Sequence, residues 1–440
     1  IKKVKVFTMK KDNLIRNHLT KKGLFCIILT KLSEKNHLFC HDYLDNNKKC
    51  GKSAKNEEDF MKKKYIMAPG PTEVPPEVIA EAAKPVMHHR TPQFRKILAE
   101  VLDGMKYVLG TTRNVYLMAS SGTGAMEAAM ANTVSAGDKI IVCSIGAFGD
   151  RWENLGKAYG ANIVKISAEW GYAIKPQELK KALDENPDAV AVFIQLNETS
   201  TGVYNDIEAM GKLTAGHKAL LVVDGISGIG AQPFYMDKWG VDIIVVGSQK
   251  GLMIPPGLAY VACSEKAWKV IEANKTPKFY FDLKRSEKAL TKEKMPDTPW
   301  TSAVSLICQQ AVALRMIKEE TNEKVWERHA KLSKAVREGI KALGLELFAK
   351  ENPAVVLTSV VVPEGVDGKA LVKKIRDDYG ISMAGGQLKM EGKIFRIGTL
   401  GYTDRFDPIM GVAAVEMALK EMGANIEIGK GVKRTMEVLM

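Results

Sequence analysis

From Met67 onward, the chain alternates short apolar runs with longer segments in which apolar residues recur at helical spacing. A short apolar run between polar residues predicts a buried strand, and sustained helical spacing predicts a helix. Strands are expected at 115–118, 139–143, 191–194, 219–223, 241–246 and 258–262. Helices are expected between them, most clearly at 92–109 and 124–134. This alternation is typical of an α/β fold with a mainly parallel sheet, in which the last strand is expected to be antiparallel because it follows its predecessor directly.

Beyond residue 300 the pattern predicts two consecutive helices, at about 302–320 and 323–343. A smaller α/β unit follows, with expected strands at 354–362 and 393–397 and expected helices at 368–378 and 407–422. We therefore predict an N-terminal arm over 61–85, a large domain over 86–320 and a small C-terminal domain over 321–440. A chain of 440 residues with 46% hydrophobic content can bury cores of this size.

Residues 1–60 form a separate block, rich in Lys and Asn and without a sustained helical or strand period. Residues 1–66 contain 17 Lys and Arg against 7 Asp and Glu, which leaves 47 against 44 for the rest of the chain. The basic character therefore belongs to this block, and the body gives no reason to expect nucleic acid. We interpret 1–60 as a basic, low-order N-terminal extension before Met61. Its several acids and two serines match an organellar transit peptide poorly, although targeting stays open.

Cysteine is sparse, with six in the chain, no CxxC pair and no Cys/His group at zinc spacing. This usage argues against a metal site or a disulfide framework and suits a reducing compartment, so we expect a cytoplasmic protein. No apolar run reaches the roughly 18 residues that a membrane span requires, and we expect no membrane partner.

Two polar residues follow successive apolar strands in the middle of the chain. Asp224 ends the run 219–223, and Lys250 follows the run 241–246 after a short link. In open α/β sheets, ligands bind outside the carboxyl ends of the strands, where both side chains belong. A lysine amine can form a Schiff base with an aldehyde cofactor, and a carboxylate can keep a pyridine nitrogen protonated. Either residue alone fits an ordinary surface lysine or strand-end acid, but the pair predicts a pyridoxal phosphate enzyme with catalytic Lys250 and Asp224.

The cofactor's phosphate needs hydrogen-bond donors, and the segment Ser120-Ser121-Gly122-Thr123-Gly124-Ala125 offers them between a strand and a helix. Backbone amides and the dipole of a helix N-terminus attract anions, and the Thr123 hydroxyl can donate. No GK[ST] motif follows, which excludes a Walker A nucleotide loop. Alone, such a segment is as often a tight turn, but upstream of Asp224 and Lys250 it predicts the phosphate loop.

Three further residues are candidates for the site. Phe148 follows a strand end between small residues, where its ring could stack on the pyridine instead of packing in the core. The Thr199 hydroxyl follows the strand that ends at Gln195 and could bond the ring oxygen, with a cap or turn as the alternative. Arg396 interrupts an apolar strand and makes either a structural ion pair or a fork for a substrate carboxylate. Beside a cofactor site, we predict substrate binding.

Together these segments resemble the class V aminotransferases of the fold-type I group, above all the alanine–glyoxylate and serine–pyruvate (serine–glyoxylate) enzymes. The resemblance runs from about residue 65 to the end of the chain. Its motifs are Ala68-Pro69-Gly70-Pro71-Thr72, the Ser-Gly-Thr-Gly loop, Phe148-Gly149-Asp150-Arg151, Glu198-Thr199-Ser200-Thr201-Gly202, Val223-Asp224, Gly247-Ser248-Gln249-Lys250 and Arg396-Ile397-Gly398. It implies a pyridoxal-phosphate-dependent fold with a large, mainly parallel seven-stranded sheet and a smaller C-terminal α/β domain.

The resemblance also implies roles for single residues. It implies cofactor attachment at Lys250, ring-nitrogen pairing by Asp224, and phosphate contacts from Thr123, Gly124, Ala125 and Gln249. It further implies substrate contacts from Arg396 and Gly70, and a homodimer in which the partner lends Thr301 to the phosphate. Two departures weaken the match: Phe148 stands where the mammalian type often has Trp, and Thr298 stands where Tyr often precedes that threonine.

The function that the resemblance implies is ping-pong transfer of an amino group from alanine or serine to glyoxylate or pyruvate. A single arginine clamp suits such small substrates. Within His88-His89-Arg90, Arg90 could instead bind a second carboxylate, as an aspartate-type donor needs, or could pack at a dimer interface. A cofactor-bound subunit without turnover is another alternative, because some proteins that resemble this family were described as hydrogenase components. A cysteine desulfurase is disfavoured, since Gln249 replaces the histidine expected before the lysine.

Overall fold

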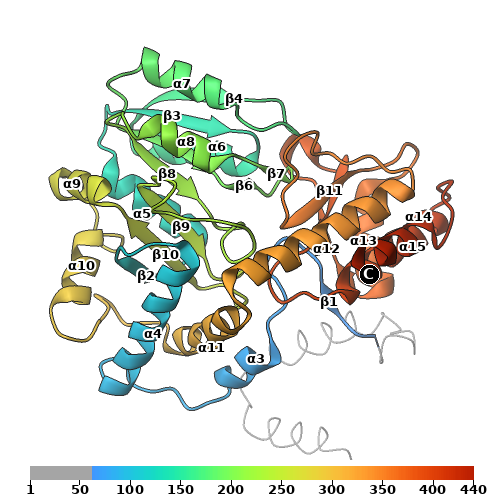
Figure 1. Cartoon of the computed structure of the whole chain (residues 1–440), viewed down its shortest axis with the longest axis horizontal. Helices are drawn as coiled ribbons and strands as arrows, with labels where there is room; N and C mark the ends of the chain where they lie inside the picture. Colours follow the sequence, from blue (N-terminus) through green and yellow to red (C-terminus); the bar gives the residue numbers. More distant parts are fainter. Residues whose placement is uncertain (1–61) are drawn as a thin grey trace, which may run out of the picture. The chain divides into compact units, whose positions relative to one another are not determined.

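A seven-stranded sheet lies at the centre of the larger part of the molecule (Figure 1). The computed structural model describes residues 62–440, so the predicted extension at 1–60 lies outside the described residues. In spatial order the strands are β2 (Val115–Ala119), β10 (Leu258–Cys263), β9 (Ile243–Gly247), β8 (Leu220–Asp224), β5 (Ala191–Gln195), β3 (Lys139–Ser144) and β4 (Asn162–Ser167). Only β10 is antiparallel to its neighbours β2 and β9, which confirms the predicted mainly parallel sheet and its one reversed strand.

The sequence pattern missed the seventh strand, β4, which lies at the edge of this sheet. Each of its residues is exposed or half-buried, whereas every residue of β5, β8 and β9 is buried. An edge strand pairs on one side only, so it does not need the continuous apolar run by which the central strands were found.

Alternate residues of each central strand supply two separate cores, one on each face of the sheet. In β8, Leu221 and Val223 face one core, and Leu220 and Val222 face the other. The first core is covered by α4 (Pro92–Leu109), α7 (Pro176–Glu185), α8 (Ile207–Thr214) and α11 (Val304–Glu320). The second is covered by α5 (Gly122–Thr133), α6 (Ala147–Ala158), α9 (Glu265–Ala273) and α10 (Leu283–Thr291). Because both faces are buried, the strands are apolar throughout, which is why they were visible in the sequence.

The helix α4 shows how local signals set its limits. The side chain of Thr91 accepts a hydrogen bond from the Phe94 amide, Pro92 occupies the first turn, and Gly110 ends the helix at φ 59° in the left-handed region. The helix therefore has the bounds that its pattern predicted.

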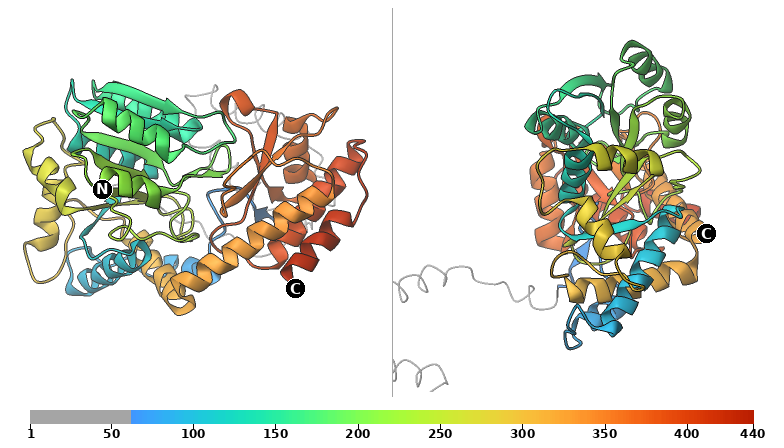
Figure 2. Two further views of the ribbon diagram at one scale, coloured as in Figure 1. Left: turned by 45° about the horizontal axis from the view of Figure 1, so that its top comes forward. Right: turned by 90° about the vertical axis from the view of Figure 1, so that its left-hand side faces the viewer.

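The long helix α12 (Asn322–Ala342) leads from the large sheet to a smaller α/β unit, as Figure 1 shows and as the turned views of Figure 2 confirm. That unit has a three-stranded antiparallel sheet in the order β11 (Leu357–Val361), β14 (Ile394–Gly398) and β13 (Ala384–Gly385). Its helices are α13 (Gly368–Tyr379), α14 (Phe406–Glu421) and α15 (Lys430–Leu439). A third core, formed by α12, α13, α14 and β14, holds it together.

The N-terminal segment of the described chain reaches both units. Its strand β1 (Tyr65–Ile66) pairs with β12 (Ile381–Ser382), and the short helix α3 (Pro76–Ala82) packs on α11. Two short strands, β6 (Asn197–Glu198) and β7 (Val203–Tyr204), and the 3-10 helix η2 (Leu388–Met390) complete the described elements. The domain limits at 85/86 and 320/321 stay a prediction. No described helix is long and apolar enough to span a bilayer.

Candidate active site

The carboxyl ends of β8 and β9 bring the two predicted catalytic residues to one edge of the large sheet. Asp224 is the last residue of β8, and Lys250 lies in the turn after β9. The two strands are parallel neighbours, with Asp224 opposite Val245. The structure therefore places both side chains where ligands bind in open α/β sheets, while their catalytic roles stay predictions.

Lys250 lies beneath the segment Pro69–Thr72. Its Nζ donates a hydrogen bond to the Pro69 carbonyl, and the Thr72 hydroxyl donates to the Lys250 carbonyl at 3.1 Å. Gly70 has φ 126°, and a Cβ added there would overlap the Lys250 side chain. The predicted substrate residue Gly70 thus lies directly against the lysine, and only a glycine leaves room for both.

The Lys250 amine has a pKa far below that of an exposed lysine. Burial and the nearby Arg396 and Arg151 cations together lower the pKa to about 8, although the Asp224 charge opposes them. A far larger fraction of this amine than of an exposed lysine is therefore neutral near physiological pH, and the neutral form is the one needed for a nucleophile or a general base.

Asp224 is buried and keeps one oxygen available. Its Oδ1 accepts a hydrogen bond from the Ile226 amide at 2.9 Å, while Oδ2 accepts none from the described residues. Burial raises the pKa of Asp224 to about 6, against the Ile226 hydrogen bond and the Arg151 and Lys250 charges that favour the ionised form. The protonated pyridine nitrogen of the predicted cofactor could donate a hydrogen bond to Oδ2.

The first turn of α5 leaves two amides free for an anion. Gly124 and Ala125 donate their amides to the Ser121 carbonyl, at 2.9 and 3.4 Å. The amides of Gly122 and Thr123 have no acceptor among the described residues, as expected for the first residues of a helix. The helix begins two residues before its predicted start, so the free backbone donors belong to Gly122 and Thr123, while the phosphate contacts predicted for Gly124 and Ala125 stay predictions.

Gln249 lies next to these amides. Gln249 follows β9 in a turn. A Cβ added to Gly247 would lie 3.0 Å from Gln249 Oε1 and 3.5 Å from the Gly122 Cα, so the side chain and the start of α5 are close together. The buried Oε1 end of the side-chain amide has no hydrogen-bond partner in the described part of the chain. The oxygen of an amide accepts hydrogen bonds, so only the Nε2 group of Gln249 could donate to a phosphate bound beside the two free backbone amides. We use the term phosphate cradle for the Gly122 and Thr123 amides together with the Gln249 side chain.

Phe148 is held at the start of α6 by the buried carboxylate of Glu198, the last residue of the short strand β6. Glu198 Oε2 accepts hydrogen bonds from the amides of Phe148 at 3.1 Å and Gly149 at 3.0 Å. Ser200 accepts from the Ala147 amide at 2.9 Å and donates its hydroxyl to Glu198 at 2.6 Å. Burial raises the pKa of Glu198 to about 7, against these donors. Glu198 and Ser200 therefore cap α6, a task that Gly146 at its N-cap cannot perform.

The turn that follows β6 joins the large sheet to Arg396. The Thr199 hydroxyl donates to Ser227 Oγ at 2.9 Å, and the Thr199 carbonyl accepts a hydrogen bond from Arg396 at 2.8 Å. Its predicted bond to the ring oxygen stays a prediction, since the hydroxyl is engaged by Ser227 in this structure. Thr199 therefore lies between the start of α6 with Phe148, the turn after Asp224 and the small domain.

Arg396 is buried in β14, where no carboxylate of the described residues pairs with it. Its Nε and Nη2 donate to the Gly385 carbonyl at 3.0 and 2.7 Å. No Asp or Glu of the described residues forms an ion pair with it, so the alternative of a structural ion pair is not observed. Burial lowers the pKa of Arg396 to about 10, and the Glu198 charge partly opposes this. A buried guanidinium with unused donors is a suitable site for a substrate carboxylate.

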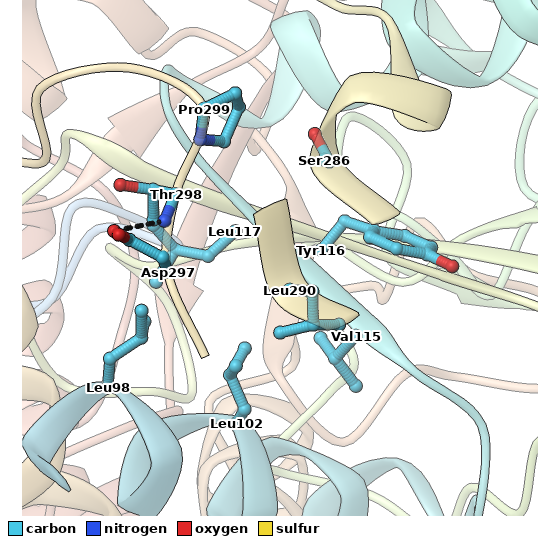
Figure 3. Close-up of a pocket in the computed structure, with 10 residues that line it drawn as sticks. All are labelled: Leu98, Leu102, Val115, Tyr116, Leu117, Ser286, Leu290, Asp297, Thr298 and Pro299. Atoms are coloured by element: carbon cyan, nitrogen blue, oxygen red, sulfur yellow. Dashed lines mark hydrogen bonds between the residues drawn. The ribbon is translucent and has the colours of Figure 1, made fainter. Parts of the chain in front are cut away.

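Two predicted residues lie away from this cluster. Arg90 donates to the Asp297 carboxylate and, at 2.8 Å, to the Thr298 carbonyl. Thr301 is exposed, a few residues further along the same loop. Figure 3 shows this loop from Asp297 to Pro299 closing a small, largely apolar pocket over Leu98 and Leu102. In this chain Arg90 therefore fixes a loop, and Thr301 does not meet Lys250.

The sequence interpretation missed several residues of the site, most clearly Arg151 and Glu198. Arg151 follows Phe148 by one helical turn and donates to the Thr123 hydroxyl at 2.8 Å. The spacing of three on a helix could have predicted that both lie on one face. The role of Glu198 had no local signal, because its partners on α6 lie about 50 residues earlier in the chain.

The site combines a lysine and an aspartate at neighbouring strand ends with a free helix N-terminus and a buried arginine. This combination fits a pyridoxal phosphate site. The chain belongs to the family described as aminotransferase class-V, whose model matches residues 64–394. Its cofactor is pyridoxal phosphate, and the chain is an aminotransferase of fold type I. The phosphate cradle, the open Oδ2 of Asp224 and the low-pKa amine of Lys250 fit that cofactor.

Curated relatives match most of this chain. The soluble hydrogenase small subunit of Synechococcus sp. is 40% identical over 86% of this chain and 98% of its own. The L-aspartate–glyoxylate aminotransferase of Paracoccus denitrificans is 36% identical over 84% and 95%. The serine–glyoxylate aminotransferase of Methylorubrum extorquens is 35% identical over 84% and 94%.

Solved structures show the same fold. The pyridoxamine–pyruvate aminotransferase of Mesorhizobium loti superposes with a TM-score of 0.83 at 29% identity, covering 87% of this chain and 98% of its own. The alanine–glyoxylate aminotransferase of Nostoc sp. superposes with a TM-score of 0.78 at 29% identity, covering 83% and 100%. The expected fold type and enzyme class are thus confirmed.

Proposed function

We propose that this aminotransferase takes its amino group from serine or alanine and passes it to glyoxylate or pyruvate. The observation that carries the proposal is Arg396, a buried guanidinium of the site with no carboxylate partner among the described residues. One such clamp matches one α-carboxylate, and an unpaired second site cation would be costly with a monocarboxylate substrate. The similarity to a serine–glyoxylate and an alanine–glyoxylate aminotransferase supports this choice.

In this proposal the chain's own residues divide the work. Bound pyridoxal phosphate supplies an electron sink for the amino acid carbanion. Arg396 binds and orients the substrate carboxylate, while Nζ of Lys250 would remove the proton from the substrate Cα and deliver it to the carbon of the cofactor's former aldehyde group. Asp224 Oδ2 holds a proton on the ring nitrogen, and Phe148 covers one face of the ring. The Gly70 segment excludes water from the lysine.

An aspartate-type donor is the second candidate, favoured by the similarity to an L-aspartate–glyoxylate aminotransferase. It needs a second cation for the side-chain carboxylate, and Arg90 was the candidate. Arg90 is instead engaged by Asp297 and Thr298, and 39% of its side chain is exposed. The contacts of Arg90 therefore support the small-substrate reading.

The deciding experiment compares specificity constants for serine, alanine and aspartate in the wild type and in Arg90→Ala. We expect serine or alanine to be preferred, with the ratio to aspartate unchanged in the variant. Preference for aspartate in the wild type, lost in Arg90→Ala, would make the protein a dicarboxylate aminotransferase and refute the proposal. Arg315→Ala, which removes a surface arginine paired with Glu100, is the matched control.

The third candidate is a protein that binds the cofactor without catalysing amino transfer, and it is suggested by the similarity to a hydrogenase subunit. A half-reaction assay tests this candidate because it measures turnover directly. Addition of serine or alanine, without acceptor, is expected to bleach the visible absorbance of the bound cofactor, and Lys250→Ala is expected to show no such band. A stable wild-type band under excess amino acid would contradict amino transfer.

We also propose a homodimer with shared sites. Thr301 is exposed beside an aromatic cluster in which Phe279 is 64% and Tyr280 45% exposed, and both rings stack on Trp300. Exposed aromatic surface of this kind is enriched at protein interfaces. Light scattering of the full chain measures the state, and a monomer at micromolar concentration would contradict it. A cytoplasmic location stays a prediction.

A further inference from the structure

Arg151, on the first turns of α6, takes part in no ion pair among the described residues. Its Nη1 donates to the Thr123 hydroxyl at 2.8 Å, and its guanidinium lies 4.8 Å from the centre of the Phe148 ring. Thr123 is also a residue of the phosphate cradle. The guanidinium is thus located between the stacking aromatic and the N-terminus of α5.

We propose that Arg151 supplies the positive charge of the phosphate cradle and orients the Thr123 hydroxyl toward the phosphate. The inference rests on the family's cofactor and on the proposed cradle, and it is independent of the choice of amino donor.

The first argument is charge. The cradle itself carries no net charge, since it consists of the Gly122 and Thr123 amides and the neutral side-chain amide of Gln249. A phosphate ester carries a charge of about −1.5 to −2 near neutral pH, and burying it needs a cation as well as hydrogen bonds. Lys250 is committed to the cofactor aldehyde and Arg396 to the substrate. Arg151 is the remaining arginine that contacts a cradle residue in the described part of the chain.

The second argument is hydrogen bonding. A threonine hydroxyl has one proton to donate and can accept from others. Because Arg151 donates to Thr123 Oγ1, the hydroxyl proton points away from the guanidinium, and no described residue accepts it. An anion at the α5 N-terminus would be that acceptor. The pair therefore presents one charge and one directed donor to the phosphate.

A competing role for Arg151 would act on the ring of the cofactor. The cation lies against Phe148, and its charge is felt by both Asp224 and Lys250. If Arg151 served only these groups, its removal would weaken the binding of any pyridoxal, with or without a phosphate. The two roles therefore differ in one measurable quantity, the preference for the phosphorylated cofactor.

The test measures the affinity of the full chain, freed of cofactor, for pyridoxal phosphate and for pyridoxal by absorbance titration. We expect Arg151→Gln to bind pyridoxal phosphate roughly 10- to 100-fold more weakly and pyridoxal within about threefold of the wild type, as for the loss of a charge-assisted contact. Arg151→Lys, which keeps the charge, is expected to retain most of the preference. Lys165→Gln is the matched control. Lys165 lies on β4, outside the cradle, and it pairs with Asp150 and Glu153 of α6, the helix that also carries Arg151.

Each outcome decides a separate point. Equal weakening for both ligands in Arg151→Gln would overturn the inference and assign Arg151 to the ring. Unchanged binding of both would overturn it as well. A wild type that does not prefer pyridoxal phosphate to pyridoxal would refute the cradle itself. If Arg151→Gln does not fold, Thr123→Val, which removes the directed hydroxyl, must lower the same preference, and an unchanged preference there would overturn the inference.

Discussion

At the scale of single residues, the pKa of the Lys250 amine is determined by the groups that surround it. Burial and the cations Arg396 and Arg151 bring its pKa to about 8. Only the neutral amine attacks an aldehyde, and below the pKa its fraction falls tenfold for each pH unit.

The rate of cofactor attachment to the free protein is therefore expected to rise with pH up to about 8 and then to level. Because the Arg396 cation lowers this pKa, Arg396→Gln is expected to move the plateau to higher pH. Stopped-flow absorbance at several pH values measures both. Arg315→Gln, a surface control, should leave the profile in place. A plateau that does not move in Arg396→Gln would contradict the assignment.

Asp224 acts through its charge rather than through its shape. In Asp224→Asn the amide oxygen can still accept the Ile226 hydrogen bond that Oδ1 receives now, at 2.9 Å. The neutral side chain cannot hold a proton on the ring nitrogen. We expect cofactor binding to persist and turnover to fall roughly 10- to 100-fold, since a charge-assisted hydrogen bond is worth about 1.5–3 kcal/mol. Steady-state kinetics at saturating cofactor measure the loss, and wild-type turnover would rule the role out.

At the scale of elements, the segment before α3 decides whether the lysine is covered. It is anchored on both sides, since the Thr72 amide donates to the Gln249 carbonyl at 3.2 Å and the Gly398 amide donates to the Met67 carbonyl at 2.6 Å. Gly70 lies between these anchors, so it cannot retreat from Lys250.

Gly70→Ala is expected to displace either the segment or the lysine and to lower the rate of cofactor attachment by ~10-fold or more, because its Cβ has no room. Gly137→Ala is the matched control. Gly137 has φ 87° and nothing within 4 Å of an added Cβ, so this variant carries the backbone strain without the overlap. Attachment rates and melting temperatures of both variants separate the two effects. Equal loss in both would attribute the defect to backbone strain alone.

At the scale of the whole molecule, the proposed shared sites predict complementation between two defective chains. Lys250→Ala removes the lysine of its own site but keeps Thr301, and Thr301→Ala does the reverse. A mixed dimer would contain one site with both residues. Refolding the two variants together is expected to restore activity at limiting cofactor above the sum of the separate variants. No gain on mixing would contradict a partner's contribution from Thr301.

The amino-acid sequence by itself determined the strands of the large sheet and the two residues at their ends. Strands buried on both faces must be apolar throughout, so β5, β8 and β9 were visible, and Asp224 and Lys250 stood out where the apolar runs stop. The edge strand β4 lacked that signal. The start of α5 was placed two residues late, because Gly122 and Thr123 at its first turn are weak helix formers.

Only the tertiary structure decided which distant side chains meet one another around the site. Glu198 meets α6 across about 50 residues of chain, and the carbonyl of Thr199 meets Arg396 across 197. The engagement of Arg90 by Asp297 spans 207 residues and weighs against the aspartate-type alternative. Such contacts depend on packing between distant segments, which periodicity cannot report. The identity of the chemistry is therefore local in the sequence, whereas the charges that tune it and limit its substrates come from the fold.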